Sequence, residues 1–146
     1  MAKGQKMKAR EIMHKGTQCV AEDQTLMDAA RMMRDLGVGC VPICGTDDRL
    51  KGMITDRDIV VKCVAEGRSA QDIKAREFGG ELYWIDADAD ISEALETMEQ
   101  HQIKRLPVID TKNNHRLIGM ISEADLARNL SDEKLAEFVE HVYATA

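Results

Sequence analysis

An internal repeat constrains the fold of this chain more than any other feature of its sequence. The run Lys8-Ala9-Arg10-Glu11 returns as Lys74-Ala75-Arg76-Glu77, and Gly52-Met53-Ile54 returns at nearly the same offset as Gly119-Met120-Ile121. A long unit that occurs twice in 146 residues predicts a pseudo-symmetric pair, because solenoid repeats are shorter and stack in larger numbers. We expect repeat 1 at 7–67, a polar linker at 68–76, repeat 2 at 77–130 and a C-terminal helix at 131–146.

Turn and capping residues predict the order β-α-β-β-α within each repeat. Thr25 with Asp28 three residues later resembles a capping box, and Gly37 is typical of the position that ends a helix. Asp90 with Glu93 repeats the helix-start signal in the second half. The predicted fold class is therefore α+β, with two pseudo-symmetric β-α-β-β-α repeats packed as one pair and followed by a C-terminal helix.

Two predicted helices have apolar faces, and we expect each face to be buried by tertiary packing. The helix that follows Thr55 should bury four residues at helical spacing, namely Ile59, Val60, Cys63 and Val64. The tail helix should present a narrow apolar stripe made of Leu135, Phe138, Val139 and Val142. Such a stripe must pack on something, which is either its own domain or another subunit.

The charge and hydropathy of the chain narrow the classes of partner. The formal net charge is −6, whereas a nucleic-acid binder usually carries a basic face, so we expect no nucleic-acid partner. Apolar runs are only a few residues long, so we expect no membrane span. The basic N-terminus is not followed by the apolar core of a signal peptide, which predicts a cytoplasmic protein.

The four cysteines and four histidines show no spacing typical of a metal or redox site. Structural disulfides are rare in a reducing compartment, so we expect none among Cys19, Cys40, Cys44 and Cys63, and we expect Cys40 and Cys44 to be small core hydrophobes. Cys40 and Cys44 lie about 13 Å apart along one strand and cannot bridge to each other. Ordinary surface or hydrogen-bonded roles are expected for His14, His101, His115 and His141.

Each repeat contains a polar motif where a strand is expected to run into a helix. The motif is Gly-x-x-Thr/Ser-x-x-Asp, with Thr55 and Asp58 in the first copy and Ser122 and Asp125 in the second. A hydroxyl and a carboxylate beside the free backbone N–H groups of a helix start form a cradle suited to a phosphate and a ribose. The same residues are good helix caps, worth ~1 kcal/mol without any ligand, and the two roles can coexist.

These units resemble a tandem CBS-domain pair (a Bateman module) from about residue 7 to residue 130. The resemblance rests on the repeated element order, on a strand with a Pro-Val-like sequence in each repeat, and on the duplicated motif. The run 48–62 is also similar to that of small stand-alone CBS pairs. The resemblance implies clefts between two sheets that hold an adenosine derivative, with AMP, ADP or ATP preferred over S-adenosylmethionine or NAD. It further implies a homodimer of CBS pairs.

The resemblance also implies a role for each matched position. Asp58 and Asp125 would hold ribose hydroxyls, and Thr55 and Ser122 would contact a phosphate. The apolar contacts to adenine would come from Val20, Ile43, Ile85 and Val108. The basic groups near the phosphates would be Arg57, Lys104 and Arg105. Because these basic groups are distributed unequally between the repeats, we expect the two clefts to differ in affinity.

The predicted function is a non-catalytic sensor that binds an adenine nucleotide and signals through an unknown protein effector or an oligomer change. We find no pair of nucleophile and base in the sequence, so we expect neither a catalytic residue nor a metal site. Two alternatives stay open. One is a structural or interaction module with vestigial clefts, and the other is a redox-responsive or metal-responsive protein built on the four cysteines.

Overall fold

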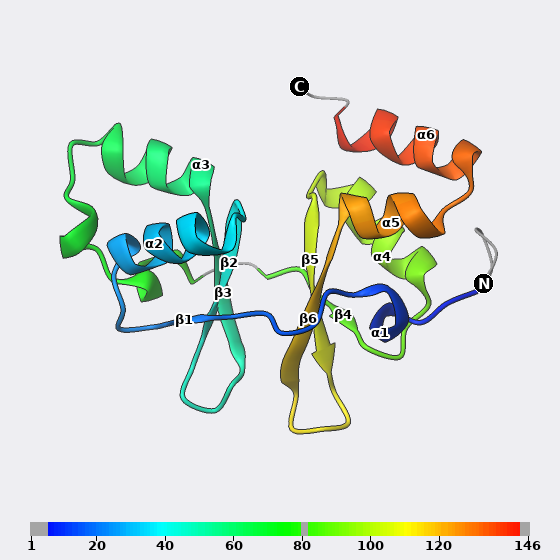
Figure 1. Cartoon of the computed structure of the whole chain (residues 1–146), viewed down its shortest axis with the longest axis horizontal. Coiled ribbons are helices and arrows are strands. Elements are labelled where there is room, and N and C mark those ends of the chain that lie inside the picture. The colour runs from blue at the N-terminus through cyan, green and yellow to red at the C-terminus, as the bar shows by residue number, and fades with distance from the viewer. Residues whose placement is uncertain (1–5, 80–81, 144–146) are drawn as a thin grey trace. The chain divides into compact units, whose positions relative to one another are not determined.

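The computed structural model describes residues 6–79 and 82–143, which form two compact units (Figure 1). The first unit is residues 18–82, and the second unit combines residues 1–17 with residues 83–146. The segment that opens the first sequence repeat therefore packs with the second unit. Residues 144–146 of the expected C-terminal helix lie outside the described residues.

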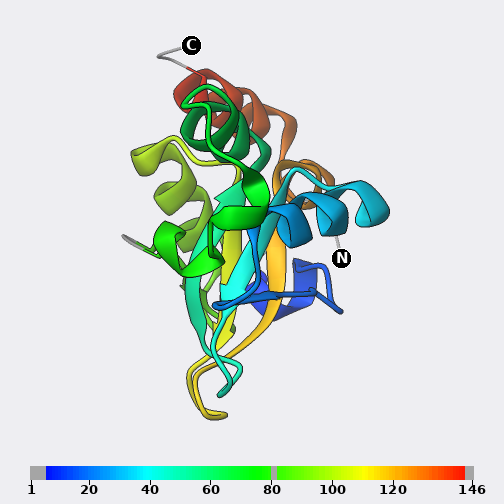
Figure 2. The same cartoon turned by 90° about the vertical axis from the view of Figure 1, so that its left-hand side faces the viewer.

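The first unit contains a three-stranded sheet in the order β1-β2-β3. β1 pairs in parallel with β2, and β2 pairs antiparallel with β3. Figure 2 turns this unit toward the viewer, with α2 in blue and the β2–β3 hairpin in cyan. Its elements are β1 (Val20–Ala21), α2 (Leu26–Leu36), β2 (Cys40–Cys44), β3 (Leu50–Thr55), α3 (Asp56–Ile59), the π-helical η1 (Val60–Val64) and the 3-10 turns η2 (Ala70–Asp72) and η3 (Ala75–Phe78).

The second unit repeats this topology with the sheet order β4-β5-β6. β4 is parallel to β5, and β5 is antiparallel to β6. Its elements are α1 (Ala9–Ile12), β4 (Ile85–Asp86), α4 (Ile91–His101), β5 (Arg105–Asp110), β6 (Arg116–Ser122), α5 (Glu123–Asn129) and α6 (Asp132–Val142). The predicted α+β class and the element order are therefore confirmed for both repeats.

Local capping explains where α2 begins and ends. The Asp28 N–H donates to Thr25 Oγ1 at 3.2 Å, and the Thr25 N–H donates to Asp28 Oδ2 at 3.0 Å. The hydrogen bond from the Thr25 N–H stabilises the charged carboxylate and lowers the pKa of Asp28. Gly37 ends the helix at φ +67°, a left-handed conformation that glycine adopts without strain. The predicted capping box and stop signal are thus confirmed.

An ionic network attaches the N-terminal segment to the second unit. Arg10 Nε donates to Asp88 Oδ1 at 2.9 Å, and this hydrogen bond lowers the pKa of Asp88. The Ala9 N–H donates to the Ala89 carbonyl at 2.9 Å, so backbone contacts support the charged pair. The Thr111 hydroxyl likewise lowers the pKa of Asp86. Asp88 therefore helps to hold the chain's first segment in place, whereas Asp86 binds the segment that follows β5.

The prediction of which residues the helix after Thr55 buries is wrong in part. Cys63 is fully buried, but Val60 and Val64 are 57% and 66% exposed. The reason is that this stretch is π-helical, with the Ala65 N–H donating to the Val60 carbonyl at 2.8 Å. A π-turn holds more residues than an α-turn, so side chains spaced for an α-helix no longer share one face.

The tail helix packs on its own unit. Phe138 is fully buried and Val142 nearly so, and α6 lies against α4. Val139, which the sequence placed in the same stripe, is 45% exposed, so the packed stripe is narrower than expected. None of the helices in the described residues combines the length and the apolar character needed to cross a membrane.

We predict that Phe138→Ala destabilises the second unit by about 3–5 kcal/mol, because it removes a fully buried aromatic ring and leaves a cavity. Val139→Ala on the same helix is the matched control and should change stability by less than about 0.5 kcal/mol. Urea unfolding followed by circular dichroism measures both. Equal effects of the two substitutions would show that α6 does not depend on this contact.

Candidate functional site

The first corner, which we define as Thr55 to Asp58, joins the end of β3 to the start of α3. Thr55 has an extended backbone, and its Oγ1 accepts a hydrogen bond from the Asp58 N–H at 3.0 Å. In return the Thr55 N–H donates to Asp58 Oδ2 at 3.0 Å. The hydroxyl and the carboxylate therefore form a reciprocal cap, which holds both polar groups at one helix start.

The second corner, Ser122 to Asp125, has the same arrangement between β6 and α5. The Ser122 N–H donates to Asp125 Oδ2 at 2.8 Å, and the Asp125 N–H donates to Ser122 Oγ at 3.4 Å. The Ser122 hydroxyl also donates to Asp125 Oδ2 at 3.0 Å. The capping role considered from the sequence is present in both copies.

The glycine of each motif allows a second segment to cross the strand closely. A Cβ added at Gly119 would lie 2.6 Å from the His14 carbonyl oxygen, and one at Gly52 would lie 2.9 Å from the Phe78 carbonyl oxygen. At the second corner the crossing segment is bonded to β6, since the His14 N–H donates to the Met120 carbonyl at 2.8 Å. The crossing brings the His14 side chain to the second corner.

The two corners differ in burial and in their neighbours. The Asp125 side chain is 2% exposed, and it is contacted by His14 Nε2 at 3.1 Å and Arg128 Nη2 at 2.7 Å. The Asp58 side chain is 25% exposed, and the cation beside it is the more exposed Lys62, whose Nζ lies 3.4 Å from Asp58 Oδ1. The same duplicated acid therefore lies in a closed site in one repeat and an open site in the other.

The second corner also brings a serine, a histidine and an aspartate together, which the sequence did not reveal. His14 Nε2 lies 3.4 Å from Ser122 Oγ and 3.1 Å from Asp125 Oδ2. A hydrolytic triad needs the serine and the acid on opposite nitrogens of the ring, so that the acid orients the base. Here one nitrogen faces both groups, and Ser122 is itself bonded to Asp125. The arrangement holds the corner together and lacks the geometry of a nucleophile with its base.

The residues predicted to contact adenine are paired by the sheets but lie inside the cores. Val20 is opposite Ile43 in the first unit, and Ile85 is opposite Val108 in the second. All four side chains are buried in the hydrophobic cluster of their own unit. The structure therefore brings each predicted pair together and gives it a packing role.

The predicted basic residues divide between the two corners. Arg57 is exposed in the first turn of α3. Arg105 is opposite Ser122 in the β5–β6 ladder, which places it at the second corner. Lys104 precedes it, and its Nζ lies 4.3 Å from the ring centroid of Tyr143 at the end of α6. Tyr143 also donates a hydrogen bond to Glu123, so the tail helix contacts the second corner as well.

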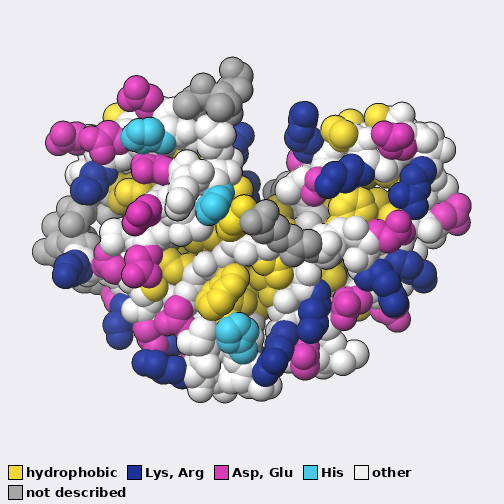
Figure 3. All heavy atoms as spheres, turned by 180° about the vertical axis from the view of Figure 1, so that it is seen from behind, with side chains coloured by type: hydrophobic (Ala, Val, Ile, Leu, Met, Phe, Trp, Pro, Cys, Tyr) yellow, Lys and Arg dark blue, Asp and Glu magenta, His cyan; other side chains and the backbone are white. Residues whose placement is uncertain are grey.

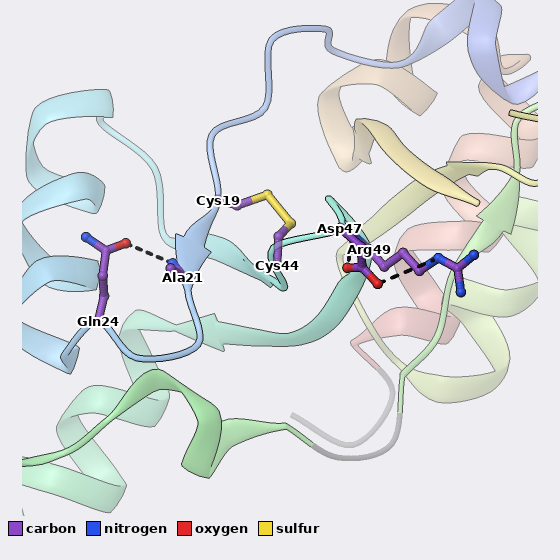
Figure 4. Close-up of a disulfide and its surroundings, with 6 residues drawn as sticks. All are labelled: Cys19, Ala21, Gln24, Cys44, Asp47 and Arg49. Carbon is purple, nitrogen blue, oxygen red and sulfur yellow. Dashed lines mark hydrogen bonds and ion pairs between the residues drawn. A yellow bond between two sulfur atoms is a disulfide. The ribbon is translucent and has the colours of Figure 1, made fainter. Parts of the chain in front are cut away.

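The expectation that the cysteines form no disulfide is wrong for one pair. Cys19 and Cys44 are joined, with their Cα atoms 5.7 Å apart (Figure 4). The parallel pairing of β1 with β2 places the residue before Val20 beside the end of β2. Spacing along the chain excluded only the Cys40–Cys44 pair and could not reveal this one. Cys40 and Cys63 lie outside the disulfide, and Cys63 is buried as expected.

Metal ligation finds no support in the parts of the chain that the structure describes. In residues 6–79 and 82–143, no three His, Cys, Asp or Glu side chains lie close enough together to hold a metal ion.

His14, Arg128 and Tyr143 are the site residues that sequence reasoning missed. The sequence signal for two of them is a departure from the repeat, since Gly80 stands at the position equivalent to His14 and Val61 at the position equivalent to Arg128.

Comparison with known proteins agrees with this architecture. The family model of the CBS domain matches residues 9–64 and 75–132. Hypoxic response protein 1 of Mycobacterium tuberculosis is 47% identical over 135 residues, which are 92% of this chain and 92% of that protein.

The solved structures that are similar to this chain include a Hypoxic Response Protein I structure and a CBS domain protein. The crystal structure of Hypoxic Response Protein I with two coordinated zinc ions has a TM-score of 0.78 and 49% sequence identity, and covers 86% of this chain and 100% of that chain. A CBS domain protein from Pyrobaculum aerophilum complexed with AMP has a TM-score of 0.76 at 20% identity, covering 91% of this chain and 98% of that chain. At this low identity the second likeness is one of fold. Two family matches on two units of equal topology confirm the resemblance found in the sequence, and the chain belongs to the CBS-domain family as a tandem pair.

Proposed function

We propose that this chain is a non-catalytic regulatory module that binds an adenosine-containing nucleotide. The observation that carries the proposal is the first corner, where the exposed edge of Asp58 stands beside the Thr55 hydroxyl at a helix start. A carboxylate is a good acceptor for the two hydroxyls of a ribose, and a helix start favours a phosphate. Support comes from the family, one of whose members has been crystallised with AMP.

The non-catalytic part of the proposal rests on the geometry of the second corner. Ser122, His14 and Asp125 do meet, but one imidazole nitrogen faces both partners, which is unsuited to activating the serine.

The proposal also includes no nucleic-acid partner, as expected from the sequence. Figure 3 supports it for the face drawn, where Lys and Arg side chains are interspersed with Asp and Glu.

We predict that an adenosine compound raises the melting temperature of the purified protein. A ligand that binds only the folded state stabilises it by about 2.7 kcal/mol at a hundredfold excess over its Kd. Differential scanning fluorimetry with AMP, ADP, ATP, S-adenosylmethionine and NAD measures the effect, with GMP as the matched control. If none of the five compounds shifts the transition at millimolar concentration, the clefts are vestigial and the module is structural.

We further propose that the protein is a homodimer that buries an apolar face of the first unit. This face, which we call the valine face, consists of the exposed residues Val60, Val61 and Val64; Leu36 and Val38 of the same unit are exposed as well. The equivalent positions of the second repeat are Ala127, Arg128 and Ser131, so the fold itself does not require valines here. Exposed apolar patches of this kind mark interaction surfaces, and a symmetric dimer would bury the same patch from both copies.

We predict that Val60→Glu with Val64→Glu converts the dimer to a monomer, because the two charges would be buried without partners at the interface. Val139→Glu, at an exposed valine of the second unit, is the control and should leave the mass unchanged. Analytical ultracentrifugation measures the mass of each protein. A monomeric wild-type protein would contradict the proposal.

The Cys19–Cys44 disulfide favours a second candidate function, a response to the redox state. It closes a loop over a sequence separation of 25 residues and joins the chain before β1 to the end of β2. Zinc is the alternative suggested by the Hypoxic Response Protein I structure. The described residues do not fit it, since no cluster of three suitable ligands occurs among them.

We predict that reduction of this disulfide lowers stability by about 3–4 kcal/mol, because the unfolded chain regains the freedom of a loop of this length. The melting temperature with and without a phosphine reductant measures the effect. A Cys19→Ser/Cys44→Ser variant should lose the response to the reductant, whereas Cys40→Ser should retain it. An identical melting temperature in both conditions would remove the redox candidate.

A further inference from the structure

The tail helix α6 covers α4 through an apolar contact. Phe138 is fully buried and Val142 nearly so, and both belong to the hydrophobic cluster of the second unit. Leu135 of α6 and Leu95 of α4 are partly buried against the same cluster. Because residues three and four positions apart share one face of a helix, Leu135, Phe138 and Val142 present a single apolar face. The second unit therefore has a surface on α4 that accepts an amphipathic helix.

The charges of the two helices oppose this contact. α4 carries three glutamates and no lysine or arginine, and α6 carries four acids against one lysine, so each helix has a formal charge of −3. Packed helices have axes about 8–10 Å apart, which lies within the Debye length of about 10 Å at 0.1 M salt. Like charges on α4 and α6 therefore repel each other at ordinary ionic strength.

One ion pair across the contact offsets this repulsion in part. It joins His141 Nδ1 of α6 to Glu99 Oε1 of α4 at 3.7 Å, and a histidine is only partly protonated at neutral pH. Glu93 and Glu96 of α4 are exposed, and neither forms an ion pair in the part of the chain that the structure describes. The acidic groups of α4 are therefore poorly matched by the helix that covers them.

The first unit shows the equivalent surface without a covering helix. Gly37 and Gln102 each end their helix in the left-handed conformation, which aligns the next residues, Val38 and Ile103. Val38 is 42% exposed, whereas Ile103 is partly buried against the cluster that contains Phe138. Among the described residues the first unit has no counterpart of α6, and the second CBS-domain match ends where α6 begins. The repeat can therefore fold without the covering helix.

We propose that the surface of α4 beneath α6 is a docking site for a basic amphipathic helix of a partner protein, and that α6 is an acidic cover which the partner displaces. The partner helix carries apolar residues at the spacing of Leu135, Phe138 and Val142, because that pattern fits the surface. Its basic residues face the glutamates of α4, so the repulsion present with α6 becomes an attraction.

The cover makes docking competitive. Only Leu130 and Ser131 separate α6 from α5, so α6 is held at a high effective concentration beside α4. A partner helix binds only when its better charge match outweighs that advantage. Any change that loosens α6 therefore raises the affinity for the partner, which is the signature of an autoinhibitory contact.

The test uses the full-length protein and synthetic peptides of residues 131–143. In the lysine peptide the four acids of α6 are replaced by lysine, and the control peptide keeps the unchanged sequence. A third peptide, the apolar-deleted peptide, combines the four lysines with Phe138→Ser and Val142→Ser. We expect the lysine peptide to bind at least about tenfold more tightly than the other two, because it alone has both the apolar face and the matching charge. Fluorescence anisotropy of labelled peptides measures the three affinities.

Two protein variants separate the cover from the surface. His141→Glu places a carboxylate opposite Glu99 and loosens α6 without changing α4, so the lysine peptide should bind at least about threefold more tightly than to the wild type. Glu96→Lys changes α4 itself, three residues from Glu99, and should weaken the same peptide at least about threefold. Hydrogen exchange of the α6 amides should become faster when the lysine peptide binds, while the amides of β5 stay protected.

Three results would overturn the proposal. The first is that the lysine peptide binds neither the wild-type protein nor His141→Glu. The second is that it binds while the α6 amides keep their protection, which would place it elsewhere on the protein. The third is that the apolar-deleted peptide binds equally well, which would leave charge alone as the cause. None of these measurements involves a nucleotide or the valine face, so the inference and the proposed function fail independently.

Discussion

The reciprocal cap at the strand-to-helix corner is the interaction on which the rest of this structure depends. In each unit one hydroxyl and one carboxylate, three residues apart, satisfy each other's backbone N–H groups at the start of a helix. The cap ends the third strand, sets the direction of the helix that follows and leaves polar atoms at a fixed place. A glycine three residues before the hydroxyl lets a crossing segment approach the strand closely. Structure and candidate function therefore share the same few residues, which explains why a capping motif can also hold a ligand.

The internal repeat gives the chain two such corners, and their neighbours differ. The second corner lies under the N-terminal segment and near the tail helix, and its buried acid is contacted by His14 and Arg128. Among the described residues the first corner has no counterpart of these neighbours, and its acid is partly exposed to solvent. A similar division applies to the helices, since α6 covers α4 in the second unit while the valine face of the first unit is exposed. In the second unit the acid of the corner and the outer side of α4 are covered by the chain's own residues. In the first unit the equivalent acid is partly exposed and the valine face is exposed.

Features that depend on neighbours three or four residues apart could be predicted from the sequence. The capping box at Thr25, the left-handed Gly37 and the caps at Thr55 and Ser122 all follow from local hydrogen bonding, and the repeat then doubled the information available. The buried face of the segment after Thr55 could not be predicted, because a π-turn shifts side chains away from the α-helical spacing. The roles assigned to Val20 and Ile85 illustrate another limit. Their pairing with Ile43 and Val108 is real, but pattern alone could not distinguish a wall of the cleft from a residue inside the core.

The sequence by itself determined the number of units, their element order and the position of both polar corners, because a repeat and its caps are written in consecutive residues. Only the tertiary structure decided which corner is closed. His14 and Ser122 are separated by 108 positions. The contact between them exists because Gly119 lets the segment that contains His14 cross closely over β6. The Cys19–Cys44 bond depends in the same way on the parallel pairing of two strands. Such contacts arise from the packing of whole elements, so no spacing within the chain records them.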